Sequence, residues 1–108
     1  MSEFPKLKVM KRDGREEEFI PEKLVVSLLK VNVPLNLARI IAKIIECRIY
    51  ERGGKAGTWE IAKWVLEILE RENKEWYDKW VEYNLKVKGR DIVKELEQYI
   101  YPEVTITP

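Results

Sequence analysis

The feature that most constrains this sequence is one run of apolar residues at helical spacing. The run occupies positions i, i+3, i+4, i+7 and i+8, and consists of Ile61, Trp64, Val65, Ile68 and Leu69. This spacing places all five side chains on one face of an α-helix that begins at Thr58. Such a face must be buried against other elements. The run therefore predicts a packed domain in which helices dominate.

Two earlier segments show the same periodicity and have clear ends. The first begins at Pro21, which suits the first turn of a helix, and ends before Asn32-Val33-Pro34. The second runs from about Pro34 to about Arg52, with Gly53-Gly54 as its C-cap and loop. The apolar stripe of the first contains Leu24, Val25, Leu28, Leu29 and Val31. The wider stripe of the second contains Leu37, Ala38, Ile40, Ile41, Ala42, Ile44, Ile45 and Ile49.

The C-terminal third predicts further helical structure. A fourth helix from about Lys74 to Lys86 would turn Trp76, Trp80, Val81 and Tyr83 inward. Residues 88–90 form a hinge, and residues 91–101 are expected to form a short fifth helix capped by Asp91. The last seven residues read as an extended or disordered tail.

Residues 6–20 predict a β-hairpin. Asp13-Gly14 is the strongest short turn signal, and residues 16–20 would form the return strand. Three glutamates have poor strand propensity, so this strand should be short and at a sheet edge. A two-residue turn would place Lys11 and Arg12 in the last strand positions, with their side chains on opposite faces.

These elements predict an α+β fold that is mainly helical. An N-terminal β-hairpin would pack as a lid on a four-helix bundle with a short C-terminal helix, because two strands alone are marginally stable in water. The chain has 108 residues, of which 45% are hydrophobic and 36% charged, and this suits one domain with a real core.

The residue types present exclude several kinds of chemistry. The sequence has no histidine and one cysteine, Cys47, so it excludes an intrachain disulfide, a His/Cys zinc site and histidine catalysis. Cys47 is expected to be a small buried residue. No P-loop, GxGxxG or Ser/Lys nucleophile pattern is present. We therefore expect a binding module with no catalytic residues and no metal site, and not an enzyme.

Charge and hydropathy bear on partners and location. The net charge is +1, which does not favour nucleic acid as a partner. The N-terminal residues show no apolar signal-peptide region, and the apolar runs are too short to span a membrane. The expectation is a cytoplasmic protein with no membrane partner.

A cluster of cations around the predicted hairpin suggests an anion site. Lys11 and Arg12 precede the turn, and Lys23 lies in the first turn of the following helix. A cation there does not help the helix dipole, whereas a bound phosphate would be favoured by the free N–H groups and by the cations. The alternative is that these residues are surface charges paired with the glutamates at positions 16–18.

Two other groups of residues also have alternative interpretations. Thr58 is expected to be an N-cap, although a hydroxyl at that position also faces any ligand that approaches the helix end. The tryptophans and tyrosines of the two later helices are expected in the core, and an adenine slot lined by one of them is the alternative.

The segment "VMKRDGREEEFIPEKL" resembles the opening signature of the ATP-cone domain, which includes lysine-arginine-aspartate-glycine and a later phenylalanine-aspartate. "VPLNLARIIAKII", "ERGGKAGTWEIAKWVLEIL" and, more loosely, "WYDKWVEYNLK" are similar to its later helices, in the same order. The resemblance covers about residues 7–88, so we expect a cone-like domain at 1–88 and an extension at 89–108.

The resemblance implies a regulatory, nucleotide-binding function. ATP-cones have a hairpin or three-stranded cap over four helices and bind ATP or dATP, with or without Mg²⁺. They act as allosteric domains of ribonucleotide reductases, where they change the oligomeric state, and they also occur in the transcriptional repressor of the reductase genes. For this chain it implies a module that signals nucleotide state to a protein partner or through self-association.

The resemblance also implies a set of nucleotide-binding residues. These come from the hairpin, the first and third helices and the end of the fourth, and are Val9, Lys11, Arg12, Glu17, Lys23, Thr58, and Lys86 or Lys88. Lys11, Arg12 and Lys23 would contact phosphates, and Glu17 would lie in the lid strand. The chain departs from the family at Ile20, where an aspartate is usual, so the N-cap of the first helix should be missing.

Two other functions remain open. The basic residues near both ends of the cone-like region would suit a small DNA-associated transcriptional regulator, although the near-neutral total charge argues against it. Alternatively, a degenerate cone would serve as an oligomerisation or interaction module, with its interface on the apolar second helix and the C-terminal tyrosines.

Overall fold

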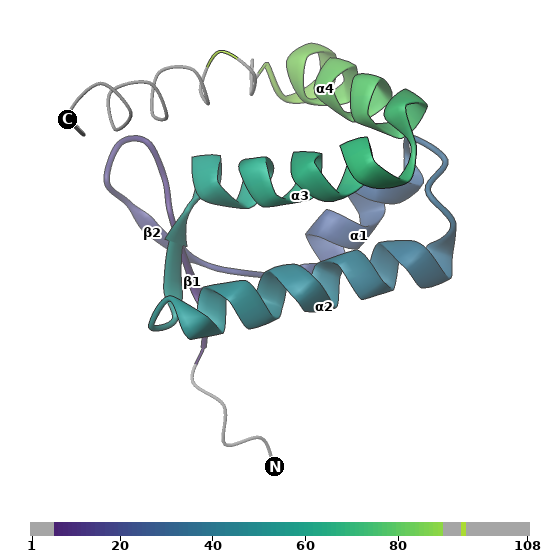
Figure 1. The fold of residues 1–108 in the computed structure, drawn as a ribbon. Coiled ribbons are helices and arrows are strands. Elements are labelled where there is room, and N and C mark those ends of the chain that lie inside the picture. The colour runs from purple at the N-terminus through teal and green to yellow at the C-terminus, as the bar shows by residue number, and fades with distance from the viewer. Residues whose placement is uncertain (1–5, 90–93, 95–108) are drawn as a thin grey trace, which may run out of the picture.

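Residues 6–89 form four helices and a small three-stranded sheet, as a computed structural model shows (Figure 1). The structure describes residues 6–89 and Lys94. In chain order the elements are β1 (Lys8–Met10), β2 (Glu16–Glu18), α1 (Pro21–Leu29), α2 (Leu35–Glu51), β3 (Lys55–Gly57), α3 (Thr58–Glu72) and α4 (Lys74–Lys88). The mainly helical α+β prediction is confirmed at this level. Apart from Lys94, the predicted fifth helix at 91–101 and the tail lie outside the described residues.

The sheet contains one strand more than the residue patterns predicted. The strand order is β2-β1-β3, with β1 antiparallel to β2 and parallel to β3. Val9 lies between Glu17 on one side and Ala56 on the other. Gly53-Gly54 was expected as a C-cap and loop, and no strand was predicted between it and Thr58, since Ala and Gly have low strand propensity. Pairing with β1 makes a strand of this segment, and α1 and α2 form the crossover that a parallel pair requires.

The hairpin turn is longer than the predicted two residues. The Lys11 carbonyl accepts from Gly14 N–H at 3.0 Å, and Lys11 N–H donates to the Arg15 carbonyl at 2.7 Å, which leaves residues 12–14 as the loop. Gly14 has φ +91°, as a three-residue loop with a left-handed last position requires. The Asp13 carboxylate accepts from Arg15 N–H at 3.0 Å and stabilises this form. Arg12 therefore lies in the loop and not in the strand.

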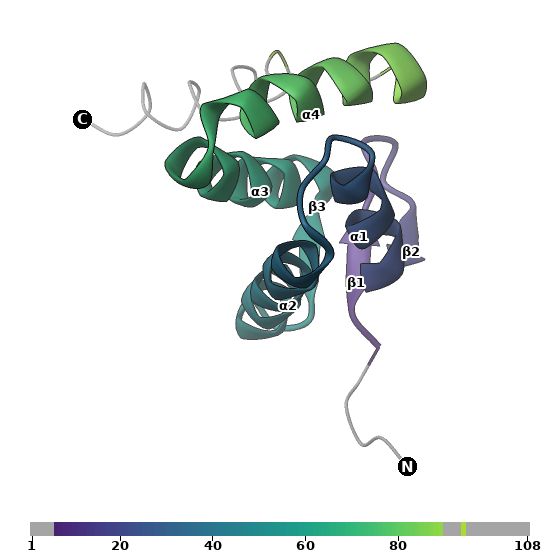
Figure 2. The same ribbon diagram turned by 90° about the vertical axis from the view of Figure 1, so that its right-hand side faces the viewer.

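The helices pack in chain order, with α1 on α2, α2 on α3 and α3 on α4. In Figures 1 and 2 the sheet lies at one end of α2 and α3, where β3 joins these two helices. Within the described residues, no helix has both the length and the apolar character needed to cross a membrane.

The core is formed mainly by the predicted stripes. The fully buried apolar side chains come from α1, the following loop, α2 and α3, and include Leu28, Val33, Ile41, Ile45, Ile49, Val65 and Leu69. Leu29 and Ile40 were placed on the buried stripes but are 40% and 52% exposed. Both lie at the stripe margins, past the point where a neighbouring element covers the helix. Cys47, predicted to be buried, is also exposed, because the covered face of α2 contains Ile45 and Ile49.

The predicted helix ends are confirmed at α1 and α2. After α1, Val33 N–H donates to Leu28 and Asn32 N–H to Leu29, with Asn32 at φ +71°. After α2, Gly54 N–H donates to Ile49 and Gly53 N–H to Tyr50, with Gly53 at φ +91°. Both are Schellman motifs, which satisfy the last carbonyls and turn the chain back toward the sheet.

Replacing Gly53 with alanine should lower the free energy of unfolding by about 1–2 kcal/mol. A Cβ at this position would have no atom within 4 Å, so the cost comes from the left-handed backbone conformation alone. The urea midpoint measures this effect. Gly53→Asn is the matched control and should cost less, because asparagine tolerates this conformation. Equal midpoints for wild type and both variants would contradict the argument.

Candidate functional site

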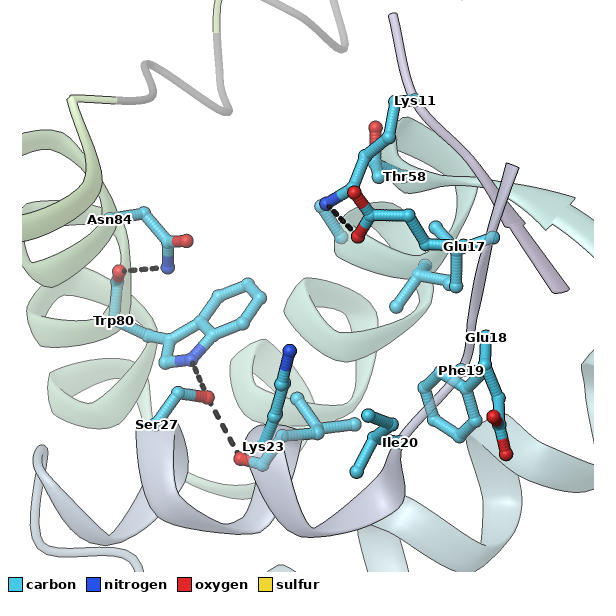
Figure 3. A pocket seen from close by; sticks show the side chains of 14 residues that line it. Lys11, Glu17, Glu18, Phe19, Ile20, Lys23, Ser27, Thr58, Trp80 and Asn84 are labelled. Carbon is cyan, nitrogen blue, oxygen red and sulfur yellow. Dashed lines mark hydrogen bonds and ion pairs between the residues drawn. The ribbon is translucent and has the colours of Figure 1, made fainter. Parts of the chain in front are cut away.

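A pocket of about 160 Å³ lies between the hairpin, α1, the start of α3 and α4 (Figure 3). Its polar lining comes from all four parts and consists of Lys11, Glu17, Glu18, Lys23, Ser27, Thr58 and Asn84. Its apolar lining includes Val9, Leu24, Ile61, Ala62 and Trp80. The charged lining side chains are at least partly exposed, whereas Ser27, Trp80 and Asn84 are buried. The pocket therefore has a charged, exposed mouth and a less polar, buried inner end.

Two lysines from separate elements reach this pocket. Lys11 follows β1 and Lys23 lies in the first turn of α1, and Figure 3 shows both side chains directed into the cavity. The Lys11 ammonium is 3.5 Å from Glu17 Oε1. Among the residues that the structure describes, no carboxylate forms an ion pair with Lys23. The pocket thus holds one partly neutralised cation and one that is available to a ligand.

The start of α1 adds to the positive potential at the mouth. Its N-cap is Ile20, whose side chain makes no capping hydrogen bond, as the sequence predicted. Pro21 is the first helical residue and has no N–H. The positive end of the α1 dipole therefore lies at the pocket without a capping side chain, and the acidic residue of the first turn, Glu22, is paired with Arg39 at 3.1 Å.

Thr58 is placed differently from its prediction as an N-cap. Gly57 is the N-cap residue of α3, and its N–H donates to Glu60 Oε1 at 3.0 Å. The helix begins directly after Gly57, the last residue of β3, and therefore one residue earlier than an N-cap threonine at position 58 would need. Thr58 is the first residue of α3 and lies at the pocket. A structural capping role therefore does not account for its hydroxyl.

The inner end of the pocket contains a chain of buried hydrogen bonds. The Trp80 indole N–H donates to Ser27 Oγ at 3.2 Å, and the Ser27 hydroxyl donates to the Leu24 carbonyl at 2.8 Å. The Asn84 amide Nδ2 donates to the Trp80 carbonyl at 2.8 Å. Ser27 and Asn84 were not predicted as site residues. The sequence signal for each was a polar residue on an otherwise apolar helix face. Ser27 follows Leu24 by three residues, and Asn84 follows Trp80 by four.

Exposed ion pairs hold the hairpin beside the pocket. Glu16 Oε2 accepts from Lys55 Nζ at 2.6 Å, and this hydrogen bond lowers the pKa of Glu16. Arg15 lowers the pKa of Asp13, first through its backbone N–H and then through its guanidinium. These pairs link the two outer strands and close the turn. Arg15 is also 3.3 Å from Glu17, the partner of Lys11, so Lys11 belongs to this network, whereas Lys23 forms none of its ion pairs.

The structure brings most of the predicted site residues together. Five of them line the pocket, and these are Val9, Lys11, Glu17, Lys23 and Thr58. Arg12 is in the hairpin loop and does not line the pocket. Lys86 forms an ion pair with Glu82 at 3.1 Å on the exposed side of α4, and the side chain of Lys88 lies outside what the structure describes.

Comparison of the chain with protein-family models, with curated proteins and with solved structures gives no match. A function is therefore inferred from the residues of the pocket and from the sequence resemblance to ATP-cones.

Proposed function

We propose that this protein is an ATP-cone-like regulatory module that binds ATP or dATP in the pocket between the hairpin and the helices. The observation that carries the proposal is the convergence of Lys11 and Lys23 on one cavity, beside a helix start that has no side-chain cap. In this proposal the hairpin acts as a lid and the four helices as a supporting bundle. The protein is not an enzyme but reports nucleotide state to a partner or through self-association.

The mouth of the pocket suits a polyphosphate. Phosphate oxygens accept charge-assisted hydrogen bonds from ammonium groups, and these bonds are among the strongest in proteins. The Thr58 hydroxyl, at the same pocket, is able to donate to a further phosphate oxygen. Lys11 is only partly neutralised by Glu17 at 3.5 Å, so a triphosphate of higher charge would compete for it.

Nucleotide binding would couple the hairpin to the helices. Lys11 belongs to the hairpin, whereas Lys23 and Thr58 belong to α1 and α3, so one ligand would join three elements that have few other links. A ligand shifts a conformational equilibrium only by its difference in affinity for the two states. The bound nucleotide would favour the arrangement in which the hairpin is closed on the pocket, and that arrangement is the proposed signal.

Isothermal titration calorimetry tests the proposal. We expect ATP and dATP to bind with a micromolar or lower dissociation constant, a free energy of about −8 kcal/mol, with or without Mg²⁺. Lys11→Ala and Arg12→Ala should both weaken binding if the hairpin closes on the phosphates. Sedimentation with each nucleotide then reports any change in self-association. Absence of heat with millimolar adenine nucleotide would remove the proposal.

A further inference from the structure

The orientation of the Asn84 amide is fixed by its neighbour. Asn84 is 1% exposed, and the group that faces it on α4 is the Trp80 carbonyl oxygen at 2.8 Å. A carbonyl oxygen only accepts, so the amide nitrogen must face it and the amide oxygen must point the other way. Figure 3 shows that oxygen directed into the cavity. None of the described residues donates a hydrogen bond to it.

The Trp80 indole forms the wall beside this oxygen, and its orientation is also fixed by hydrogen bonding. Trp80 is 5% exposed, and its indole N–H is bonded to Ser27, whose hydroxyl proton is in turn given to the Leu24 carbonyl. Both donors are therefore already used within the protein. Among the described residues, the inner end of the pocket offers a ligand the aromatic surface of Trp80 and one acceptor to which none of them donates, the Asn84 oxygen.

The charge distribution determines which end of a nucleotide lies there. The lysines are at the solvent-exposed mouth, and burying a polyphosphate away from them would be costly. A cavity of about 150 Å³ holds a benzene-sized ring, so this pocket has room for an aromatic ring system but not for a whole nucleotide. The base would therefore enter, and the ribose and phosphates would extend to the mouth.

We propose that Asn84 Oδ1 accepts a hydrogen bond from the exocyclic amino group of adenine and thereby selects adenine over bases that have a carbonyl there. This inference rests on the proposed function. A carbonyl at that position would place two acceptors face to face in a buried site, which leaves both unsatisfied. Sites built around a buried polar group reject ligands that lack its partner.

Titration of the wild-type protein with ATP and with inosine triphosphate tests this first. The two ligands differ at the six-position, which has an amino group in ATP and a carbonyl in the inosine nucleotide. We expect the inosine nucleotide to bind about tenfold or more weakly. Asn84→Leu should lower ATP affinity to the inosine value and change inosine affinity by less than twofold. Asn36→Leu, on an exposed position of α2, is the matched control and should alter neither.

The outcomes separate this inference from the proposed function. Equal affinities of the wild type for ATP and inosine triphosphate would overturn the role of Asn84 and leave nucleotide binding intact. If the wild type bound neither ATP nor inosine triphosphate, both the proposed function and this inference would be wrong. If dATP bound more weakly than ATP while inosine triphosphate bound as tightly as ATP, the Asn84 oxygen would be assigned to a ribose hydroxyl. That result would overturn the adenine assignment. The comparison of ATP with inosine triphosphate on the wild-type protein needs no variant, so it tests the role of Asn84 even if Asn84→Leu does not fold.

Discussion

Replacing Lys23 with methionine is expected to weaken ATP binding by about 10- to 100-fold, the effect of losing one hydrogen bond to a charged group. Lys23 is the pocket cation that no described carboxylate neutralises, and its side chain is directed into the cavity (Figure 3). Methionine keeps the apolar stem of the side chain and removes the charge. The loss should be larger than for Lys11, which must first give up its ion pair with Glu17.

Lys43→Met is the matched control for this experiment. Lys43 is exposed on α2, does not line the pocket and forms no ion pair among the described residues, so the same change in net charge occurs elsewhere. Calorimetry at two salt concentrations separates a direct contact from general attraction, since only the latter is screened over a Debye length. If both variants bound ATP equally, the attraction would come from total charge and not from the pocket.

The sequence predicted the helices because their signals are local. Apolar periodicity marks a helical face without reference to any other element. Asn32 and Gly53, each with the residue that follows it, end their helices through bonds to residues three and five positions earlier. The hairpin was also predictable, since its turn and both strands lie within residues 6–20. The prediction was wrong in detail at Ile40 and Cys47, where burial depends on how far a neighbouring helix extends.

What the residue patterns missed depends on contacts between distant segments. β3 exists because β1, more than forty residues earlier, pairs with it in parallel. That pairing also makes Gly57 the N-cap of α3, which moves Thr58 from the predicted capping position to the first turn. Neither result follows from the local sequence of residues 53–58, where two glycines and an alanine precede the helix.

The candidate site, like the fold, has one part that was predictable from the sequence and one part that was not. Its mouth was predictable, because Lys11 and Lys23 are unusual beside a turn and a helix start, and the resemblance assigned them a role. Its inner end was not, because Ser27 and Asn84 line one cavity only in the folded chain, where Trp80 of α4 comes within hydrogen-bond distance of Ser27 on α1. A polar residue within an apolar helix face was the available signal, and it does not by itself distinguish a ligand site from a satisfied core residue.

Replacing Leu28 with alanine should lower the free energy of unfolding by about 2–5 kcal/mol, the usual cost of a leucine cavity in a core. Leu28 is fully buried in α1, a helix of nine residues that is too short to be stable alone. Packing of this helix therefore supports the position of Lys23 and Ser27 at the pocket. Since whole domains have only about 5–15 kcal/mol of stability, the variant should unfold at much lower urea.

Val26→Ala is the matched control in the same helix. Val26 is 48% exposed, and truncating it should change stability by no more than about 0.5 kcal/mol. Urea midpoints with an unchanged slope would show that stability, and not the unfolded state, differs between the variants. Similar losses for Leu28→Ala and Val26→Ala would mean that α1 is not docked through the face containing Leu28, and the pocket geometry that depends on α1 would then be wrong.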